Sequence, residues 1–301
     1  MAETKDEIKI IKKSSKDYPK LLKEIHKAPK QLYVRGSLPK NCDLNFAIVG
    51  TRAASEYGKT LAFKIAKELS ELGFNIVSGL AIGIDTQAHL GALAGNGRAG
   101  GQAGKTIAVL GSAIDDNSIY PSQNLKLVDK IINSGGAVTS EYAPETKSEI
   151  WFFPERNRII AGMSRGVLVV EAPEKSGALI TARLALEQNR EVFAIPGSLF
   201  SKNSLGTNNL IKSGAKLVSS VDDILEELNL TDLKPIAMKT FENNLSKEET
   251  LILKIIGIEP LHVDKICEIT KMPMNQILST ISMLEIQGII KNIGGKFTVI
   301  K

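Results

Sequence analysis

Residues 46–79, FAIVGTRAASEYGKTLAFKIAKELSELGFNIVSG, contain a complete strand–helix–strand pattern. The segments FAIVG (46–50) and NIVSG (75–79) are short and apolar on both faces, which is typical of strands buried in a parallel sheet. Between them, four apolar side chains fall on one helical face: Leu61, Ile65, Leu69 and Leu72. Ser55 is placed to cap this helix and Gly73 to end it. The stretch therefore predicts a βαβ unit.

The same alternation continues along the chain. Further apolar strand segments are predicted at 106–110, 137–141, 167–172, 191–197 and 215–220. Helical segments are predicted between and after them, at about 84–94, 122–134, 155–163, 176–189, 208–213 and 221–228. Repeated βα units predict an α/β fold with a doubly wound, mostly parallel, Rossmann-like sheet. Ligands of such folds bind beyond the carboxyl ends of the strands.

The alternation stops near residue 229, and a different pattern follows. Helices are predicted near 246–256, 262–270 and 273–287, followed by a hairpin whose turn is Gly294-Gly295. Three helices and a hairpin are typical of a winged-helix domain. The expected organisation is an N-terminal leader at 1–40, a Rossmann-like domain at 41–230, a linker at 231–245 and the winged helix at 246–301.

Composition is that of an ordinary globular protein, with 43% hydrophobic and 24% charged residues among 301. No segment has the pattern of a membrane span or a signal peptide, so we expect a cytoplasmic protein. The cysteines, Cys42 and Cys267, stand far apart without metal-site spacing, which favours two reduced thiols and no metal site.

The net charge of +5 is unevenly distributed. Residues 1–30 hold nine lysines against five acids, residues 31–240 carry a net charge of only +1, and residues 241–301 are neutral. A nucleic-acid site in the main domain must therefore be a local patch of cations. The lysine-rich leader either attracts phosphates weakly or is a solvated tail.

Two glycine-containing turns bear on cofactor binding. Gly50-Thr51-Arg52 follows the first predicted strand but lacks the G-x-G-x-x-G pattern, which argues against a dinucleotide. Its hydroxyl and guanidinium beside a helix N-terminus suit one phosphate, although a strand-end arginine is also a common surface ion-pair partner. The segment AGGQAGKT (99–106) has Ala99 where a P-loop needs glycine, and it precedes a strand. We therefore expect no ATP site and no cofactor.

The segment FFPERNRIIAG (152–162) is the strongest candidate for anion binding. Arg156, Asn157 and Arg158 follow Pro154, which would occupy the start of a helix, and Phe152 or Phe153 could offer a ring to a base. The alternative is that the phenylalanines are core residues and one arginine is structural.

Two further motifs are compatible with binding or with structure alone. Ser176 is the expected N-cap of a helix, and Gly177 would let a backbone approach closely, as in a phosphate-binding turn or a plain capped helix. Asp85 and His89 lie four residues apart, a spacing that fits a metal or an acid–base pair. We favour hydrogen bonds that anchor a helix to its turn.

Taken in order, these motifs resemble the DprA/Smf family over residues 18–228. The resemblance is carried by YPKLLKEIHKAPKQLYVRG (18–36), IVGTR (48–52), VSGLAIGIDTQAH (77–89), KTIAVLG (105–111), YP (120–121), FFPERNRIIAGMSRGVLVVEA (152–172) and SGALITA (176–182). It implies cooperative binding of single-stranded DNA, a homodimer formed through the Rossmann-like domain, and loading of the recombinase RecA during natural transformation.

The resemblance also implies which residues contact DNA. Arg52 carries over as the contacting arginine, together with Gly50 and Thr51. Some relatives have a DNA-contacting lysine after the YP pair, where this chain has Ser122, and Lys126 is the nearest substitute. With the anion-binding motifs above, the expected nucleic-acid-binding residues are Gly50, Thr51, Arg52, Lys126, Arg156, Asn157, Arg158, Ser176 and Gly177. The glycine- and alanine-rich insertion at 97–104 is outside the family pattern, and we assign it no role.

Two other functions are weighed against this non-catalytic mediator. Nucleotide-processing enzymes similar to cytokinin-activating phosphoribohydrolases carry PGGxGTxxE, whereas this chain has SGALITA without the double glycine or the following glutamate. A winged-helix transcription factor would need cations on its third helix, yet residues 272–288 contain no lysine or arginine. We therefore expect that residues 246–301 do not read DNA.

Overall fold

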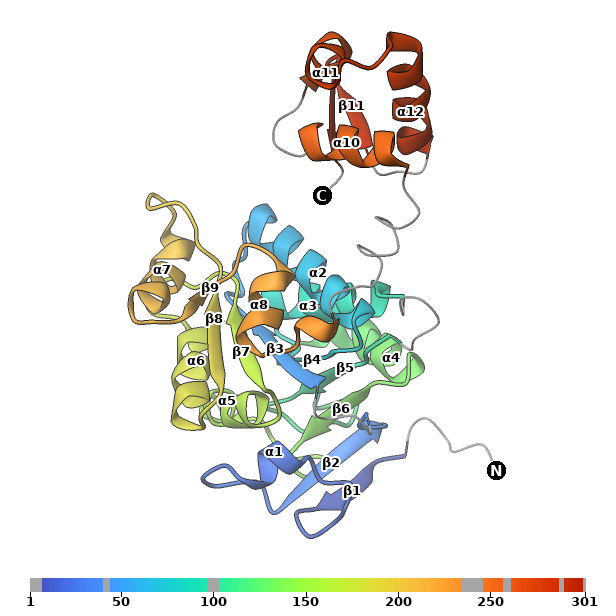
Figure 1. The fold of residues 1–301 in the computed structure, drawn as a ribbon. Coiled ribbons are helices and arrows are strands. Elements are labelled where there is room, and N and C mark those ends of the chain that lie inside the picture. Colours follow the sequence, from blue (N-terminus) through green and yellow to red (C-terminus); the bar gives the residue numbers. More distant parts are fainter. Residues whose placement is uncertain are drawn as a thin grey trace, which may run out of the picture. The chain divides into compact units, whose positions relative to one another are not determined.

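The computed structural model describes residues 7–39, 44–96, 103–233, 246–256, 261–286 and 290–299 (Figure 1). The chain divides into two compact units, residues 1–234 and 235–301. Cys42, most of the 97–104 insertion and most of the expected linker lie outside the described residues.

The first unit contains a nine-stranded sheet. In chain order its strands are β1 (Lys9–Lys12), β2 (Gln31–Gly36), β3 (Asn45–Val49), β4 (Asn75–Ser78), β5 (Thr106–Val109), β6 (Ala137–Ser140), β7 (Gly166–Val169), β8 (Glu191–Ala194) and β9 (Lys216–Leu217). Their spatial order is β1-β2-β6-β5-β4-β3-β7-β8-β9. All neighbouring strands from β6 to β9 in this spatial order pair in parallel. The predicted mostly parallel α/β fold is confirmed. Chain order reverses between β3 and β7, so the crevice at their carboxyl ends is the topological switch point.

The segment expected to be a leader differs from the prediction, because it supplies β1 and β2. These strands pair with each other, and β2 pairs antiparallel with β6. Leu32 and Val34 of β2 are buried in the sheet core, which explains why this segment joins the fold. The lysine-rich β1 then becomes the edge strand, where charged side chains discourage pairing with another chain.

Helices cover both faces of the sheet (Figure 1). One face carries α2 (Glu56–Glu71), α3 (Ile84–Ala94), α4 (Leu125–Asn133) and α8 (Val221–Glu227). The other carries α1 (Lys20–Lys23), α5 (Phe152–Gly162), α6 (Gly177–Glu187) and α7 (Leu205–Lys212). Alternate residues of β3 supply both cores, Phe46 and Ile48 on one side and Ala47 and Val49 on the other.

The ends of α2 confirm the predicted caps. The Ser55 hydroxyl accepts a hydrogen bond from the Gly58 N–H, and Gly73 adopts a φ of +88° just beyond the helix. The start of α5 differs from the prediction. Because α5 begins at Phe152, Pro154 is its third residue and Arg156 lies beyond its first turn.

The second unit is a winged helix, as predicted. Its elements are α10 (Lys247–Ile256), β10 (Leu261–His262), α11 (Val263–Thr270), α12 (Met274–Ile286), β11 (Ile290–Ile293) and β12 (Lys296–Val299). The strands form a small sheet in the order β10-β12-β11, and the glycines of the hairpin turn both have positive φ. An apolar core of Ile252, Ile266, Ile277, Ile281, Leu284 and Phe297 joins the helices to this sheet.

Among the residues that the structure describes, no helix is both long and apolar enough to cross a bilayer. The same residues contain no group of three histidine, cysteine, aspartate or glutamate side chains positioned to hold a metal ion.

Candidate functional site

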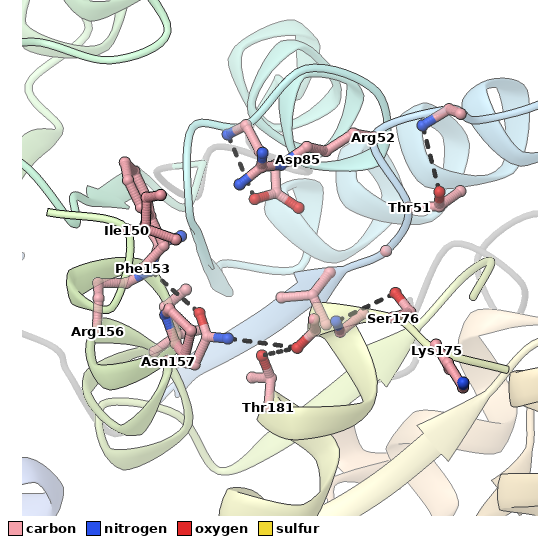
Figure 2. A pocket seen from close by; sticks show the side chains of 18 of the residues that line it. Thr51, Arg52, Asp85, Ile150, Phe153, Arg156, Asn157, Lys175, Ser176 and Thr181 are labelled. Carbon is pink, nitrogen blue, oxygen red and sulfur yellow. Dashed lines mark hydrogen bonds between the residues drawn. The ribbon is translucent and has the colours of Figure 1, made fainter. Parts of the chain in front are cut away.

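A cleft of about 700 Å³ opens at the carboxyl ends of β3 and β7, at the topological switch point (Figure 2). Its walls come from the turn after β3 (residues 50–53), the segment that enters α5 (148–154), and the segment that enters α6 (173–178). The cleft brings together Gly50, Thr51, Arg52, Arg156, Asn157, Ser176 and Gly177 among the predicted site residues. Lys126 and Arg158 do not line it.

Arg52 is an exposed cation at the cleft. Its guanidinium carbon lies 5.9 Å from the centroid of the Phe153 ring, and the guanidinium has no hydrogen bond or ion pair with a described residue. The turn below it is tightly packed, because a Cβ on Gly50 would lie 2.5 Å from Ile84 Cγ1. The buried Thr51 hydroxyl accepts a hydrogen bond from the Ala53 N–H at 3.2 Å. The turn is therefore rigid, whereas the Arg52 head remains available to an anion.

The helix N-terminus expected to help Arg52 is already occupied. The buried Glu171 carboxylate accepts hydrogen bonds from the Ser55 N–H at 2.9 Å and the Ser55 hydroxyl at 2.5 Å. A carboxylate thus satisfies the start of α2, which is where a phosphate was expected to lie. That part of the prediction is wrong. Glu171 follows β7, whose pairing with β3 brings its carboxylate beside Ser55, and local sequence does not show this contact.

The N-terminus of α6 faces the cleft instead. The Ser176 hydroxyl caps it by accepting from the Ala178 N–H at 3.3 Å. A Cβ on Gly177 would meet no atom within 4 Å, so the backbone here is open to a ligand. Lys175 also lines the cleft, is exposed, and has no hydrogen bond or ion pair with a described residue. Sequence reasoning missed Lys175, although a lysine directly before a helix cap is a readable signal for an anion site.

Arg156 is buried and holds strand ends together. Its guanidinium donates hydrogen bonds to the carbonyls of Gly79, after β4, and Val109, in β5. It also lies beside the buried Asp85 carboxylate, and a Cβ on Gly79 would overlap both side chains. Burial, opposed by Asp85 and reinforced by the positive charge of Arg52, lowers the pKa of Arg156 to about 10. Arg156 therefore stays charged at neutral pH, and its pairing with Asp85 holds the strand ends together below the cleft.

Asn157 and Arg158 lie on different faces of α5 and have different partners. Asn157 accepts from Arg156 Nε at 3.2 Å and donates to the Gly177 carbonyl at 3.3 Å, which ties α5 to α6. Arg158 instead pairs with Glu141 at 2.5 Å, with its side chain 12% exposed. Residues two apart in a helix point about 200° apart, so Arg156 and Arg158 cannot face the same cleft. The prediction that they converge is wrong.

Lys126 is exposed on α4, outside the cleft. Its contact with a nucleic acid stays a prediction.

Asp85 and His89 form hydrogen bonds within the fold, which confirms the structural interpretation. Asp85 accepts from the N–H groups of Gly79 at 3.1 Å and Ala81 at 3.4 Å, and so anchors α3 to its turn. His89 Nδ1 lies 2.7 Å from the Thr106 hydroxyl at the start of β5. Complete burial, reinforced by the charge of Arg156, lowers the pKa of His89 to about 3.

One of the two phenylalanines lies at the cleft. Phe153 lines it and packs edge-on against Tyr120, with ring centroids 5.5 Å apart. Phe152 is buried and stacks on Tyr142, with centroids 3.8 Å apart. Phe153 and Tyr120 therefore offer rings beside Arg52, and Phe152 is a core residue.

The cleft is cationic where it is exposed. Its charged lining consists of Arg52, Arg156 and Lys175 against Asp85 and Glu149. Asp85 is buried and paired with Arg156, so the exposed charges of the lining are Arg52 and Lys175 against Glu149, which leaves a net positive charge. Two cations, an open helix N-terminus and aromatic rings can bind the phosphates and bases of a nucleic-acid strand.

Comparison with known proteins gives matches over both units. The family model for DNA recombination-mediator protein A matches residues 9–229, and the DprA winged helix domain matches residues 239–296. DNA processing protein DprA of Bacillus subtilis (strain 168) is 45% identical over 216 residues, which are 71% of this chain and 69% of the relative. Protein Smf of Escherichia coli (strain K12) is 37% identical over 294 residues, which are 96% and 76% of the two chains.

Two solved structures have a similar fold. DprA from Streptococcus pneumoniae is 40% identical with a TM-score of 0.64, and the match covers 74% of this chain and 75% of that one. DNA processing protein A from Helicobacter pylori is 31% identical with a TM-score of 0.61, covering 72% and 98%. The second structure was determined to describe the single-stranded DNA binding mode of that protein.

Proposed function

The chain belongs to the DNA recombination-mediator protein A family, also called DprA/Smf, and on that premise we propose that it binds single-stranded DNA in the cleft between β3 and β7. In this proposal it is a non-catalytic cytoplasmic protein that protects incoming DNA and loads RecA during natural transformation. It acts as a homodimer formed through the Rossmann-like domain. Binding of single-stranded DNA by the Helicobacter pylori relative supports the choice of ligand.

The proposal rests mainly on the exposure of the Arg52 guanidinium and on its lack of a partner among the described residues. Arg52 presents an exposed guanidinium on a rigid turn, at the switch point of the sheet, with no partner of opposite charge among the described residues. An arginine in a structural ion pair would have such a partner, as Arg158 does. A forked guanidinium held this way suits the oxygens of a phosphate.

The remaining cleft residues have complementary roles in the proposal. Lys175 and the N-terminus of α6 at Ser176 and Gly177 would bind a neighbouring phosphate across the cleft from Arg52. Gly50 and Thr51 shape the turn. Arg156 and Asn157 act from below, Arg156 by holding the strand ends under the cleft and Asn157 by holding Gly177 in place.

Substitution of Arg52 tests this proposal directly. Arg52→Ala should weaken binding of oligo-dT by about 1.5–3 kcal/mol, or roughly 10- to 150-fold, through loss of a charge-assisted phosphate contact. The thermal stability should remain near that of wild type, because the side chain is exposed. Fluorescence anisotropy with labelled oligo-dT measures the affinity.

Lys64→Ala is a matched control, since Lys64 is an exposed cation on α2 outside the cleft. It should retain wild-type affinity. Duplex of the same length and a mononucleotide complete the series. A folded Arg52→Ala protein that binds oligo-dT as tightly as wild type would remove Arg52 from the site, and tight mononucleotide binding would favour a nucleotide-processing enzyme.

The winged helix should not contribute to DNA affinity. Its third helix, α12, has the sequence MNQILSTISMLEI without a cation, and it exposes Met274, Leu278 and Met283. Asn275 and Gln276 are exposed and could reach a base edge, but α12 has no cation to hold the flanking phosphates.

A protein ending near residue 235 should therefore keep most of its affinity for oligo-dT. The isolated 240–301 fragment should bind neither single strands nor duplex detectably at physiological salt. Titration of labelled DNA with each fragment measures this. Micromolar binding by the 240–301 fragment would contradict the prediction.

A further inference from the structure

The segment that enters α5 exposes two large apolar residues at a turn. Ile150 is 89% exposed and Trp151 is 60% exposed. A hydrogen bond from the Phe152 N–H to the Glu149 carbonyl, 3.0 Å long, closes the turn below them. The central positions of a turn usually hold polar residues or glycine, so this apolar pair is unusual.

The turn is held in place on both sides. Phe152, the next residue, is buried against Tyr142, and the Trp151 ring packs edge-on against Phe152 with centroids 4.3 Å apart. Earlier in the segment, the Glu145 N–H donates to Asp115 Oδ1 at 2.8 Å. Ile150 and Trp151 are therefore presented by a fixed support.

One residue of the apolar pair, Ile150, lies at the cleft, and Trp151 follows it directly in the chain. Ile150 lines the cleft together with Phe153, the second residue of α5 (Figure 2). Trp151 is the N-cap of α5, directly between Ile150 and the start of that helix. A strand whose phosphates lie on Arg52 and Lys175 has bases that project away from these cations, and unstacked bases are large, flat and partly apolar.

Because both residues are exposed and fixed beside the cleft, we propose that Ile150 and Trp151 form a base platform, on which a base of the bound single strand stacks. The inference rests on the proposed function and extends it. In duplex DNA the bases are already stacked on each other and cannot reach the platform. The platform therefore makes the site selective for single strands, which phosphate contacts alone cannot do.

The sequence provides a direct probe, because Trp151 is the one tryptophan of the chain. Oligo-dT labelled at one end, about 10–15 nucleotides long, is titrated with the full-length protein. Label anisotropy reports binding, and tryptophan emission reports the platform. We expect emission to be quenched in parallel with the rise in anisotropy, since a stacked base contacts the indole.

Three variants sharpen the test. Trp151→Ala should weaken oligo-dT binding by about 5- to 150-fold, the range that loss of one base–aromatic stack produces. Trp151→Phe keeps a ring and should retain most of the affinity. Ile10→Ala removes an exposed apolar side chain from the edge strand β1 and should have no effect.

An abasic strand of the same length separates stacking from phosphate contacts. Wild type and Trp151→Ala should bind it equally, and the preference of Trp151→Ala for oligo-dT over duplex should be reduced. Binding seen by anisotropy without a change in tryptophan emission would overturn the platform and leave the proposed function intact. An equal loss of affinity of Trp151→Ala for oligo-dT and abasic strand would also overturn the platform. Absence of any oligonucleotide binding would overturn the proposed function and the platform together.

Discussion

Arg156→Leu is expected to lower the free energy of unfolding by about 3–5 kcal/mol, because it leaves Asp85 buried without its counter-charge. The substitution also removes the hydrogen bonds that the guanidinium donates to the Gly79 and Val109 carbonyls. Gly79 follows β4 and Val109 lies in β5, which pairs with β4, so the substitution should loosen the ends of two neighbouring strands below the cleft. Urea denaturation at neutral pH measures it.

A double substitution tests the cause. If the unpaired carboxylate is the main cost, Asp85→Ala combined with Arg156→Leu should be less destabilising than the sum of the two single changes. Arg52→Ala is the control, with an expected effect within about 0.5 kcal/mol. A fully stable Arg156→Leu protein that has lost DNA binding would show that Arg156 acts by contacting the strand and not by holding the fold.

The α/β class could be predicted because buried parallel strands have a distinctive pattern. Segments such as 46–50 and 75–79 are apolar on both faces, and each is followed by an amphipathic helix. The edge strand β1 was missed for a related reason. β1 lies at the sheet edge and carries lysines, so its sequence resembles a solvated tail although its backbone pairs with β2.

The site could be predicted only where a motif lies directly at a strand end. Arg52 follows that rule, because its turn comes directly after β3. Arg158 does not, since its surroundings depend on the rotation of α5 and on Glu141 from β6. The blocking of the α2 N-terminus by Glu171 likewise depends on the pairing of β3 with β7. Such contacts are set by tertiary structure, which local sequence does not show.

The other large effect is a loss of stability in acid that depends on His89. The folded protein lowers the pKa of His89 to about 3, whereas an unfolded chain restores the usual value of about 6.5. Between these two values the unfolded state binds one more proton at this position than the folded state. Stability contributed by neutral His89 is therefore complete above pH 6.5 and falls as the pH drops toward 3.

Each pH unit in this window should cost about 1.4 kcal/mol, so the total approaches about 4–5 kcal/mol near pH 3. Other groups also titrate in acid, including Asp85, whose pKa is raised by burial and whose contribution has the opposite sign. Comparison of wild type with His89→Gln cancels these shared contributions. Glutamine has no proton to gain here and can still form a hydrogen bond with Thr106, the partner of His89 at 2.7 Å.

The experiment is urea denaturation of both proteins at several pH values from 7.5 down to 4. At pH 7.5 wild type should be the more stable, because the imidazole fits its buried position against Thr106. As the pH falls, the wild-type curve should descend more steeply, and the advantage over His89→Gln should shrink by about 1.4 kcal/mol per unit below pH 6.5. Two parallel curves would mean that His89 accepts a proton in the fold as readily as in the unfolded chain, which its complete burial beside the positive charge of Arg156 should prevent.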